Sequence, residues 1–228
     1  SLQIVDEEGN VWGQRDFPLR DASGRGSASW EAGQVVSTHE AIPLDAGTPP
    51  GEYRVRLRVY SLRDLQPLPI RSEGDAQPTL ALTLAPCHVI RAKVPPSPEE
   101  LPALIPLRLS LWGRIEALGY TPGREAAQSG EEVPLTLFWR VLRPEERSYL
   151  LAFSLVGQGK IWEVWRGIPI ARYPSSKWAE GEVLRYPYRL RIPPDVPTGQ
   201  YILALSLLDA ETGIPISEEP APLGTLSI

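Results

Sequence analysis

The sequence predicts an all-β fold made of two tandem immunoglobulin-like antiparallel β-sandwich units, the first of which lacks its early strands. Three observations predict this fold. Several segments alternate apolar and polar residues, which marks strands with one buried face. The 228 residues include 25 prolines and 19 glycines, and both residue types interrupt helices. Finally, the two parts of the chain repeat each other.

The strands follow from this alternation. Every second residue from Tyr53 to Val59 is apolar or aromatic, and the three residues between them are arginines. Further strands are predicted at residues 80–90, 133–139, 149–156, 186–192 and 201–208. Proline cannot donate a hydrogen bond to a sheet ladder. Because Pro187, Pro193 and Pro194 bracket the strand at residues 188–192, we expect this strand at a sheet edge.

Turn-forming residues mark the connections between the strands, and proline limits the helical structure. Residues 6–10, 157–159 and 209–213 have the composition of hairpin turns. Helical character is confined to one turn within residues 98–104, which Pro102 limits.

A proline-rich segment divides the chain. Residues 93–106 contain five prolines, which predicts a semi-rigid linker. The predicted domains are therefore a partial β-sandwich at residues 1–92 and a complete one at residues 107–228.

Five short sequence words recur in the same order in both parts. In the first part they stand at residues 9–12, 17–19, 29–36, 50–53 and 67–70. In the second part they stand at residues 159–162, 168–170, 176–184, 198–201 and 213–216. Ordered self-similarity of this kind predicts two copies of one domain.

The two copies differ at their beginning. Residues 107–158 precede the hairpin at Gly159, whereas only eight residues precede Gly9. The first copy therefore lacks about three strands of the second. An unfinished sandwich exposes a core face and free strand edges, so we expect a homodimer or strand exchange to complete residues 1–92. The chain starts at Ser1 and contains no Met, which we interpret as a fragment or a processed chain.

Composition excludes several classes of protein. The net charge of −5, from 23 basic and 28 acidic residues, argues against a nucleic-acid-binding domain. A single cysteine excludes a disulfide framework within the chain. The sequence has no Gly-x-Ser-x-Gly, phosphate-binding loop or His-Glu-x-x-His motif. No catalytic residue, metal site or cofactor is therefore predicted.

The second part carries a series of motifs that belong together. They are Leu-Gly-Tyr at 118–120, Gly-Glu-Glu-Val-Pro-Leu-Thr-Leu-Phe-Trp at 130–139, Trp162, Tyr-Pro-Ser-Ser-Lys-Trp-Ala-Glu-Gly-Glu at 173–182, Pro-Pro-Asp-Val-Pro-Thr-Gly-Gln-Tyr at 193–201, and Asp-Ala-Glu-Thr-Gly at 209–213. This series resembles the paired C-terminal β-sandwich domains of bacterial, Chloroflexi-like membrane glycosyltransferases of the dolichyl-phosphate-mannose mannosyltransferase type. The resemblance spans the second part and, with gaps, the later two-thirds of the first.

The resemblance implies a fold and a context. It implies tandem sandwiches outside the cytoplasm, on a parent chain anchored in a membrane. It transfers no catalytic residue, because such domains are appendages of the enzyme.

Trp30 and Trp178 lie at equivalent positions of the two copies. One interpretation is a platform on which a sugar ring stacks. The other is a core tryptophan that locks a loop across the end of the sandwich, as large aromatic residues commonly do.

Trp162 and Trp165 are three residues apart in a predicted strand, so we expect them on opposite faces. Of the two, Trp165 with Arg166 is the candidate for an exposed ligand-binding pair.

Arg54, Arg56 and Arg58 form a row on one strand face. The row is either a grip for anionic glycans or lipid phosphate, or a solvated outer face paired with carboxylates of the next strand. The equivalent strand of the second copy has Ile202, Ala204 and Ser206 at these positions, which predicts cover on its outer face.

Cys87 and His88 are adjacent. Catalytic Cys–His pairs meet across a fold and are rarely neighbours in sequence, so a buried structural thiol is the favoured interpretation of Cys87.

These observations predict a non-catalytic accessory or binding module at the extracytoplasmic, C-terminal part of a membrane glycosyltransferase-like protein, with a glycan as the expected ligand. Two alternatives stay open. One is a carbohydrate-binding module of a secreted protein, and the other is a purely structural or assembly domain.

Overall fold

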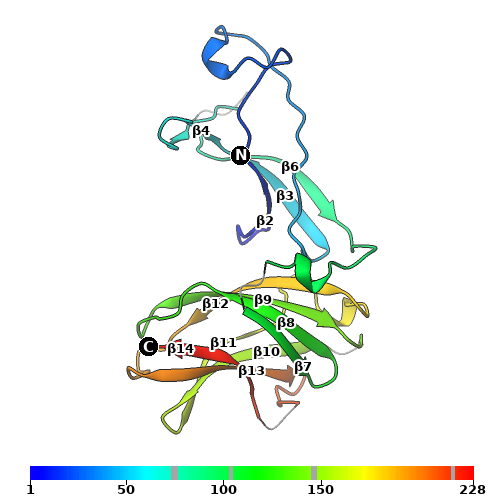
Figure 1. Ribbon diagram of the computed structural model, residues 1–228, viewed down its shortest axis with the longest axis vertical. Coiled ribbons are helices and arrows are strands. Elements are labelled where there is room, and N and C mark those ends of the chain that lie inside the picture. The colour runs from blue at the N-terminus through cyan, green and yellow to red at the C-terminus, as the bar shows by residue number, and fades with distance from the viewer. Residues whose placement is uncertain (73–76, 103–104, 145–147, 217–218) are drawn as a thin grey trace. The chain divides into compact units, whose positions relative to one another are not determined.

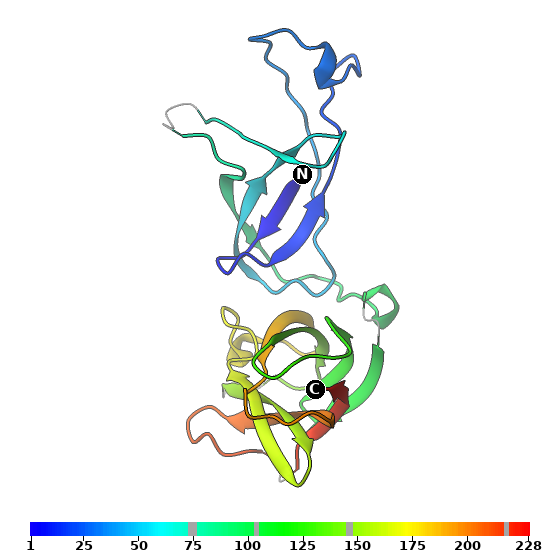
Figure 2. The same ribbon diagram turned by 90° about the vertical axis from the view of Figure 1, so that its left-hand side faces the viewer.

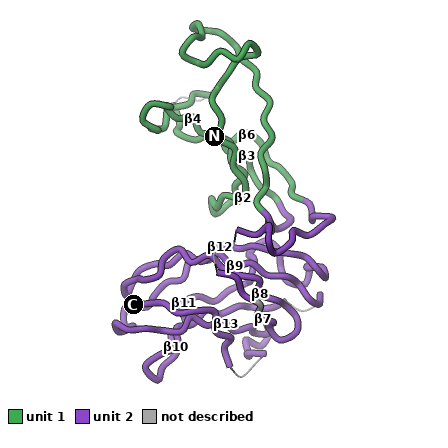
Figure 3. Tube along the Cα trace, viewed as in Figure 1, with its two compact units in different colours: residues 1–45, 52–89 green, residues 46–51, 90–228 purple. Residues whose placement is uncertain are grey.

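The computed structural model describes residues 1–72, 77–102, 105–144, 148–216 and 219–228 (Figure 1). Strands make up almost all of the regular structure, and the helices among the described residues are single 3-10 turns. The chain forms two compact units (Figure 3). Unit 1 contains residues 1–45 and 52–89, and unit 2 contains residues 46–51 and 90–228.

Unit 2 is a sandwich of two four-stranded antiparallel sheets (Figure 1). The first sheet has the order β11 (Lys160–Gly167), β10 (Tyr149–Gly157), β13 (Gln200–Asp209) and β14 (Ala221–Ser227). The second has the order β12 (Val183–Arg191), β9 (Glu132–Val141), β8 (Ile115–Pro122) and β7 (Ile105–Leu111). Strand β12 carries Pro187 and lies at the edge of its sheet, which confirms the predicted edge strand.

The core of unit 2 lies between the two sheets and is rich in aromatic rings. Trp139, Phe153, Tyr188 and Tyr201 are each at most 2% exposed. The phenol of Tyr188 donates a hydrogen bond of 2.7 Å to the Pro169 carbonyl, so this buried hydroxyl is satisfied. Burial raises the pKa of Tyr188 well above its usual range.

A second, smaller cluster covers the outer face of the second sheet. It consists of Leu101, Leu118, Phe138 and Val183, with Ala46 packed against them. The adjacent Gly47 carbonyl accepts a hydrogen bond of 2.8 Å from the Arg185 amide. The backbones approach closely because Gly47 has φ +81° and no side chain; a Cβ there would lie 3.0 Å from the Arg185 Cβ.

The cover predicted for the outer face of β13 is found at only some of its positions. Ala204 is 2% exposed, whereas Ile202 is 45% exposed. The prediction is therefore correct for Ala204 and wrong for Ile202.

The described part of unit 1 contains one four-stranded sheet (Figure 2), in which β1 pairs antiparallel with both β2 and β3. Its order is β2 (Val11–Arg15), β1 (Leu2–Val5), β3 (Gly51–Leu57) and β6 (Leu82–Val89). Strands β4 (Val59–Tyr60) and β5 (Pro67–Leu68) form a separate two-stranded sheet. The order β2-β1-β3-β6 reproduces the order β11-β10-β13-β14 of the first sheet of unit 2.

The second sheet of unit 2 has no counterpart in the described part of unit 1. Trp30 and Tyr53 are as far apart in sequence as Trp178 and Tyr201, so residues 35–43 correspond to β12 without a gap. Those residues form no strand. Strand β12 pairs with β9, and unit 1 shows no strand in the place of β9 within its described residues.

Most elements predicted from the sequence are present. The strands predicted at 53–60, 80–90, 133–139, 149–156, 186–192 and 201–208 are confirmed as β3 with β4, β6, β9, β10, β12 and β13. The predicted helical turn is the 3-10 turn η2 (Pro98–Glu100).

Candidate functional site

The repeated tryptophan word forms the same local structure in both units. Each copy has a 3-10 turn, η1 (Ser27–Ser29) or η3 (Ser175–Lys177), that ends at the tryptophan. The Trp30 indole nitrogen donates to the Arg25 carbonyl at 3.3 Å, and that of Trp178 donates to the Tyr173 carbonyl at 2.9 Å. We call residues 25–34 and 173–182 the Trp turns.

A second bond repeats as well. The Gln34 side-chain oxygen accepts a hydrogen bond of 3.1 Å from the Glu31 amide, and the Glu182 carboxylate accepts one of 2.9 Å from the Ala179 amide. These bonds join residues close in sequence, so each turn can form without help from distant strands.

Trp178 lies in the core of unit 2. It is 5% exposed, and its ring lies 5.7 Å from that of Trp139 on β9. The geometry supports the core interpretation of this residue, because a sugar ring could not reach its face.

The Trp turn of unit 2 is held by a polar cluster in which the buried Glu182 pairs with the partly exposed Arg91. The Glu182 carboxylate is 6% exposed and accepts hydrogen bonds of 3.1 Å from the Tyr173 hydroxyl. The guanidinium group of Arg91 lies 3.3 Å from Glu182 and donates to the Tyr173 hydroxyl at 2.6 Å. Burial raises the pKa of Tyr173, which therefore stays protonated at neutral pH.

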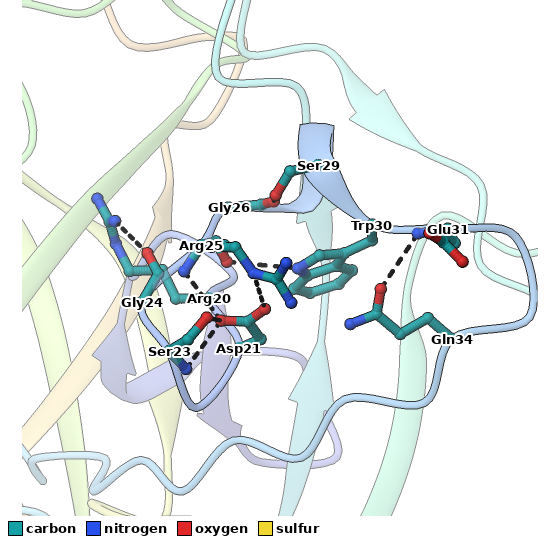
Figure 4. A network of polar contacts seen from close by, with 10 residues as sticks. All are labelled: Arg20, Asp21, Ser23, Gly24, Arg25, Gly26, Ser29, Trp30, Glu31 and Gln34. Carbon is teal, nitrogen blue, oxygen red and sulfur yellow. Dashed lines mark hydrogen bonds and ion pairs between the residues drawn. The ribbon is translucent and has the colours of Figure 1, made fainter.

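The Trp turn of unit 1 lies on the exposed connection between β2 and β3 (Figure 4). Trp30 is half-buried, and the residues around it form a polar network (Figure 4). The Asp21 carboxylate accepts hydrogen bonds from the Ser23 hydroxyl at 2.6 Å and from the Arg25 guanidinium at 2.9 Å. These bonds, the Ser23 hydroxyl first, lower the pKa of Asp21 to about 2.

Two arginines accompany Trp30. Arg25 pairs with Asp21 but remains 64% exposed at its side chain. Arg20 donates from its guanidinium group to the Gly24 carbonyl at 2.8 Å. Of the predicted ligand-binding tryptophans, Trp30 is thus the one that the structure places on an accessible, charged loop.

The expectation that Trp162 and Trp165 lie on opposite faces is wrong. In the β10–β11 ladder, Trp162 pairs with Leu155 and Trp165 with Phe153, and a bulge at Val164 separates the two pairs. The extra residue restores the same facing direction, so both rings face the core.

The ring of Trp165 therefore packs against other aromatic rings of unit 2. Its ring centroid lies 5.7 Å from that of Phe153 and 4.9 Å from that of Tyr188. Arg166 forms an exposed ion pair with Glu163 at 2.5 Å. The structure therefore does not join Trp165 and Arg166 into one surface.

The arginine row of β3 lies on the outer face of the unit 1 sheet. The Arg56 guanidinium donates at 2.8 Å to the Gln3 side chain, which in turn donates at 2.8 Å to Gln14. The partner predicted on the next strand is therefore a glutamine and not a carboxylate. Arg54 is exposed and Arg58 half-buried.

The inner face of the unit 1 sheet is only partly covered. It comprises Leu2, Ile4, Tyr53, Val55 and Leu57, which we call the open face. Tyr53 is 6% exposed and packs edge-on against Trp12 with ring centroids 6.0 Å apart. Leu2, Val55 and Leu57 are half-buried.

The equivalent face of unit 2 is fully covered. Leu203, Leu205 and Leu207 on β13 are 6%, 0% and 0% exposed. A hollow of about 270 Å³ adjoins the open face at Leu57 and Val59 and is also lined by Gly26 and Ser27 of the Trp turn. Alternation predicted which residues share this face, but it could not show that the face stays half-covered.

Unit 2 has its own hollow, of about 560 Å³, lined by residues such as Tyr120, Leu190 and Leu203. Arg124, which also lines it, is paired with Glu131 at 3.3 Å. This pairing reduces the charge available to a ligand.

Cys87 and His88 do not form a reactive pair. Nδ1 of His88 lies 2.6 Å from a carboxylate oxygen of Glu52. Burial raises the pKa of the half-buried Cys87 thiol, which disfavours the nucleophilic thiolate.

Nowhere among the described residues do three or more His, Cys, Asp or Glu side chains gather as a bound metal ion requires. The helices in the same residues lack the length and apolar character needed to cross a lipid bilayer.

The fold defines the class of protein as all-β, with antiparallel sheets and a β-sandwich in unit 2. No protein-family model matches the sequence, and none of the curated proteins does.

Several solved structures are similar at low scores. The C-terminal domain of Wzt is 10% identical with a TM-score of 0.33, over 51% of this chain and 71% of that one. The sporulation control protein Spo0M from Bacillus subtilis is 18% identical with a TM-score of 0.32, over 49% of each chain. The ApaA protein from Bordetella pertussis is 16% identical with a TM-score of 0.25, over 50% of this chain and 91% of that one.

Proposed function

We propose that the chain is a non-catalytic β-sandwich interaction module in which unit 2 is a closed scaffold and unit 1 is the binding element. One observation carries the proposal. The apolar face that is fully covered in unit 2 is half-covered in unit 1, although both sheets have the same strand order. Uncovered apolar sheet faces are typical of docking sites.

Energetics support this role. Burial of apolar surface contributes about 25 cal/mol per Å². Covering Leu2, Val55 and Leu57, which are half-buried, would therefore stabilise unit 1 together with its partner. Unit 2 offers no comparable gain on its matching face, where Leu205 and Leu207 are 0% exposed.

Amide hydrogen exchange of the whole chain tests the proposal. We expect the amides of β3 to exchange on the order of 100-fold faster than those of β13, because a half-covered sheet opens locally at lower cost. The two strands occupy matching places in one molecule, so β13 serves as the internal control. Equal protection of β3 and β13 would show that unit 1 is closed and would overturn the proposal.

Glycan binding at the Trp turn of unit 1 is the second candidate function. The observation that favours it is the half-buried indole of Trp30 beside the exposed guanidinium of Arg25. Aromatic rings bind the apolar faces of sugars, and arginine binds anionic groups through paired hydrogen bonds.

Fluorescence titration with neutral and anionic polysaccharides tests this second function. We expect saturable quenching that Trp30→Ala abolishes and that Arg166→Ala leaves unchanged, since Arg166 lies on unit 2 and is paired with Glu163. Quenching that survives Trp30→Ala would place glycan binding elsewhere.

We also propose, from the motif resemblance at residues 118–213, that the module belongs to a membrane glycosyltransferase-like protein and lies outside the cytoplasm. Protease treatment of intact cells that express the tagged parent protein tests the location. Cleavage within the module supports it, and full protection contradicts it.

A further inference from the structure

We propose that unit 1 accepts a donor strand with the chemistry of β9, namely apolar side chains at alternate positions and an indole that packs on Trp30. This inference deepens the proposed function and rests on it. It identifies the partner of the open face as an extended polypeptide segment rather than a folded protein surface.

Unit 2 shows what such a strand does when it is present. Strand β9 pairs with β12 in a continuous antiparallel register of nine residue pairs, from Val183 opposite Arg140 to Arg191 opposite Glu132. Its inward side chains are all at most 3% exposed: Val133, Leu135, Leu137, Trp139 and Val141. The strand thus provides both a backbone ladder and the centre of the core.

In unit 1 the receiving segment is present and touches β2, where the Pro43 carbonyl lies close to Gly13 and Glu40 pairs with Arg15. Residues 35–43 correspond to β12 and belong to no sheet in the described structure. Val35 is 91% exposed where its counterpart Val183 is 5% exposed. Leu44 is 46% exposed where its counterpart Ile192 is 0% exposed. The segment has the sequence position of a strand and the exposure of a loop.

The Trp turn of unit 1 provides a second contact for the donor strand. Trp178 packs on Trp139 of β9 with ring centroids 5.7 Å apart. Trp30 lies in the corresponding turn but is only half-buried. A donor strand in the β9 position would place an aromatic ring where Trp139 stands in unit 2.

Glu40 affects which side chain the donor strand can carry at one position. Glu40 takes the place of the buried Tyr188 and pairs with Arg15 at 3.6 Å. In unit 2, Tyr188 lies opposite Leu135. The donor residue opposite Glu40 is therefore free to be polar, whereas the positions of Leu137 and Trp139 require apolar groups.

A second copy of the chain is not the expected occupant. Its own β9 is hydrogen-bonded on both sides, to β8 and to β12, and lending it would dismantle the core of unit 2. A polypeptide segment that belongs to neither unit can add as a strand and make the same backbone bonds at no such cost.

The test uses the whole chain and a synthetic peptide with the sequence of residues 130–141. We expect saturable one-to-one binding, a blue shift of tryptophan emission, and protection of residues 35–43 and β3 from hydrogen exchange. The control peptide carries Leu137→Asp and Trp139→Ser, which we expect to weaken binding at least about tenfold. A matched chain variant, Val36→Pro, removes an amide from the acceptor segment and should weaken binding similarly.

Several outcomes would overturn the inference. These are no protection at residues 35–43, equal binding of the two peptides, or peptide-induced exchange within unit 2. A dimer that protects β3 without peptide, detected by light scattering, would replace the donor strand by face-to-face pairing of two copies. Fast exchange of β3 without any peptide effect would refute the donor strand alone, whereas slow exchange of β3 in the free chain would refute the proposed function as well.

Discussion

Units 1 and 2 contain the same sequence words but differ in how far those words are buried. Both form a hairpin with a tryptophan that packs edge-on against a tyrosine, Trp12 with Tyr53 and Trp162 with Tyr201. Both form a Trp turn. Yet Trp178 is in a core and Trp30 is not. The comparison separates structure that a local sequence can form alone from structure that needs a distant strand.

The Trp turn belongs to the first kind. Its bonds run between residues three to five apart, so it forms with or without a covering sheet. The strand at β12 belongs to the second kind. Its ladder is made entirely with β9, and the corresponding residues 35–43 remain irregular.

We expect the largest difference in stability between the two units when the core tryptophan Trp139 and the half-buried Trp30 are each replaced by alanine. Trp139→Ala should destabilise unit 2 by about 3–5 kcal/mol, the usual cost of emptying a core aromatic site. Trp30→Ala should cost only about 1 kcal/mol, because Trp30 is half-buried and leaves no core cavity. Denaturant unfolding followed by circular dichroism measures both.

A conservative variant separates packing from polarity at the same site. The indole nitrogen of Trp139 is buried and has no hydrogen-bond partner among the described residues. Trp139→Phe keeps a ring and removes this nitrogen, so its cost should be far smaller than that of Trp139→Ala. Equal losses of stability for Trp139→Ala and Trp30→Ala would contradict the difference in burial between the two units.

The matching leucines of the two inner faces come next. Leu205→Ala should cost about 2–5 kcal/mol, because Leu205 is 0% exposed. Leu57→Ala should cost about 1 kcal/mol in the free chain, because Leu57 is half-buried. When the donor peptide is bound, Leu57→Ala should cause a larger loss of stability than in the free chain. Calorimetric melting of the complex would detect this increase.

A smaller difference is expected within the Trp turns. Glu182→Ala removes the acceptor for Tyr173 and the partner of Arg91, and should destabilise unit 2 by about 2 kcal/mol. Gln34→Ala removes one exposed hydrogen bond and should cost less than about 1 kcal/mol. A larger loss for Gln34→Ala, measured by thermal unfolding, would contradict the assignment of unit 1 as the open copy.

The smallest effect concerns pH and unit 1 alone. The folded pKa of Asp21 is lowered to about 2, below the unfolded value of about 3.9. The carboxylate therefore stabilises the loop above the unfolded pKa, and this contribution is lost as the pH falls through about 2. The Trp30 indole NMR signal should shift in that window, and the shift should be absent in Asp21→Asn.

Much of the fold could be predicted from sequence because its signals are local. Alternation gave the strands, Pro187 marked an edge, and the repeated words identified two copies. Counting the residues before Gly9 predicted the absence of about three strands from unit 1, but it did not predict that residues 35–43, the counterpart of β12, form no strand.

The candidate site was less predictable because it depends on pairing. The bulge at Val164, which brings Trp162 and Trp165 to one face, arises from the ladder with β10 and has no sequence signal of its own. The same holds for Arg56, whose partner Gln3 becomes its neighbour only when β1 pairs with β3.

The bond between Gly47 and Arg185 has a consequence for solubility. Strand β12 is the free edge of a sheet in unit 2, and free edges promote aggregation. Pro187 removes one amide from that edge, and the Gly47 carbonyl occupies another. If unit 1 accepts a strand as proposed above, a second strand-accepting edge in the same chain would let copies associate in series. Pro187 and the Gly47 carbonyl together make β12 a poor template for such edge-to-edge association.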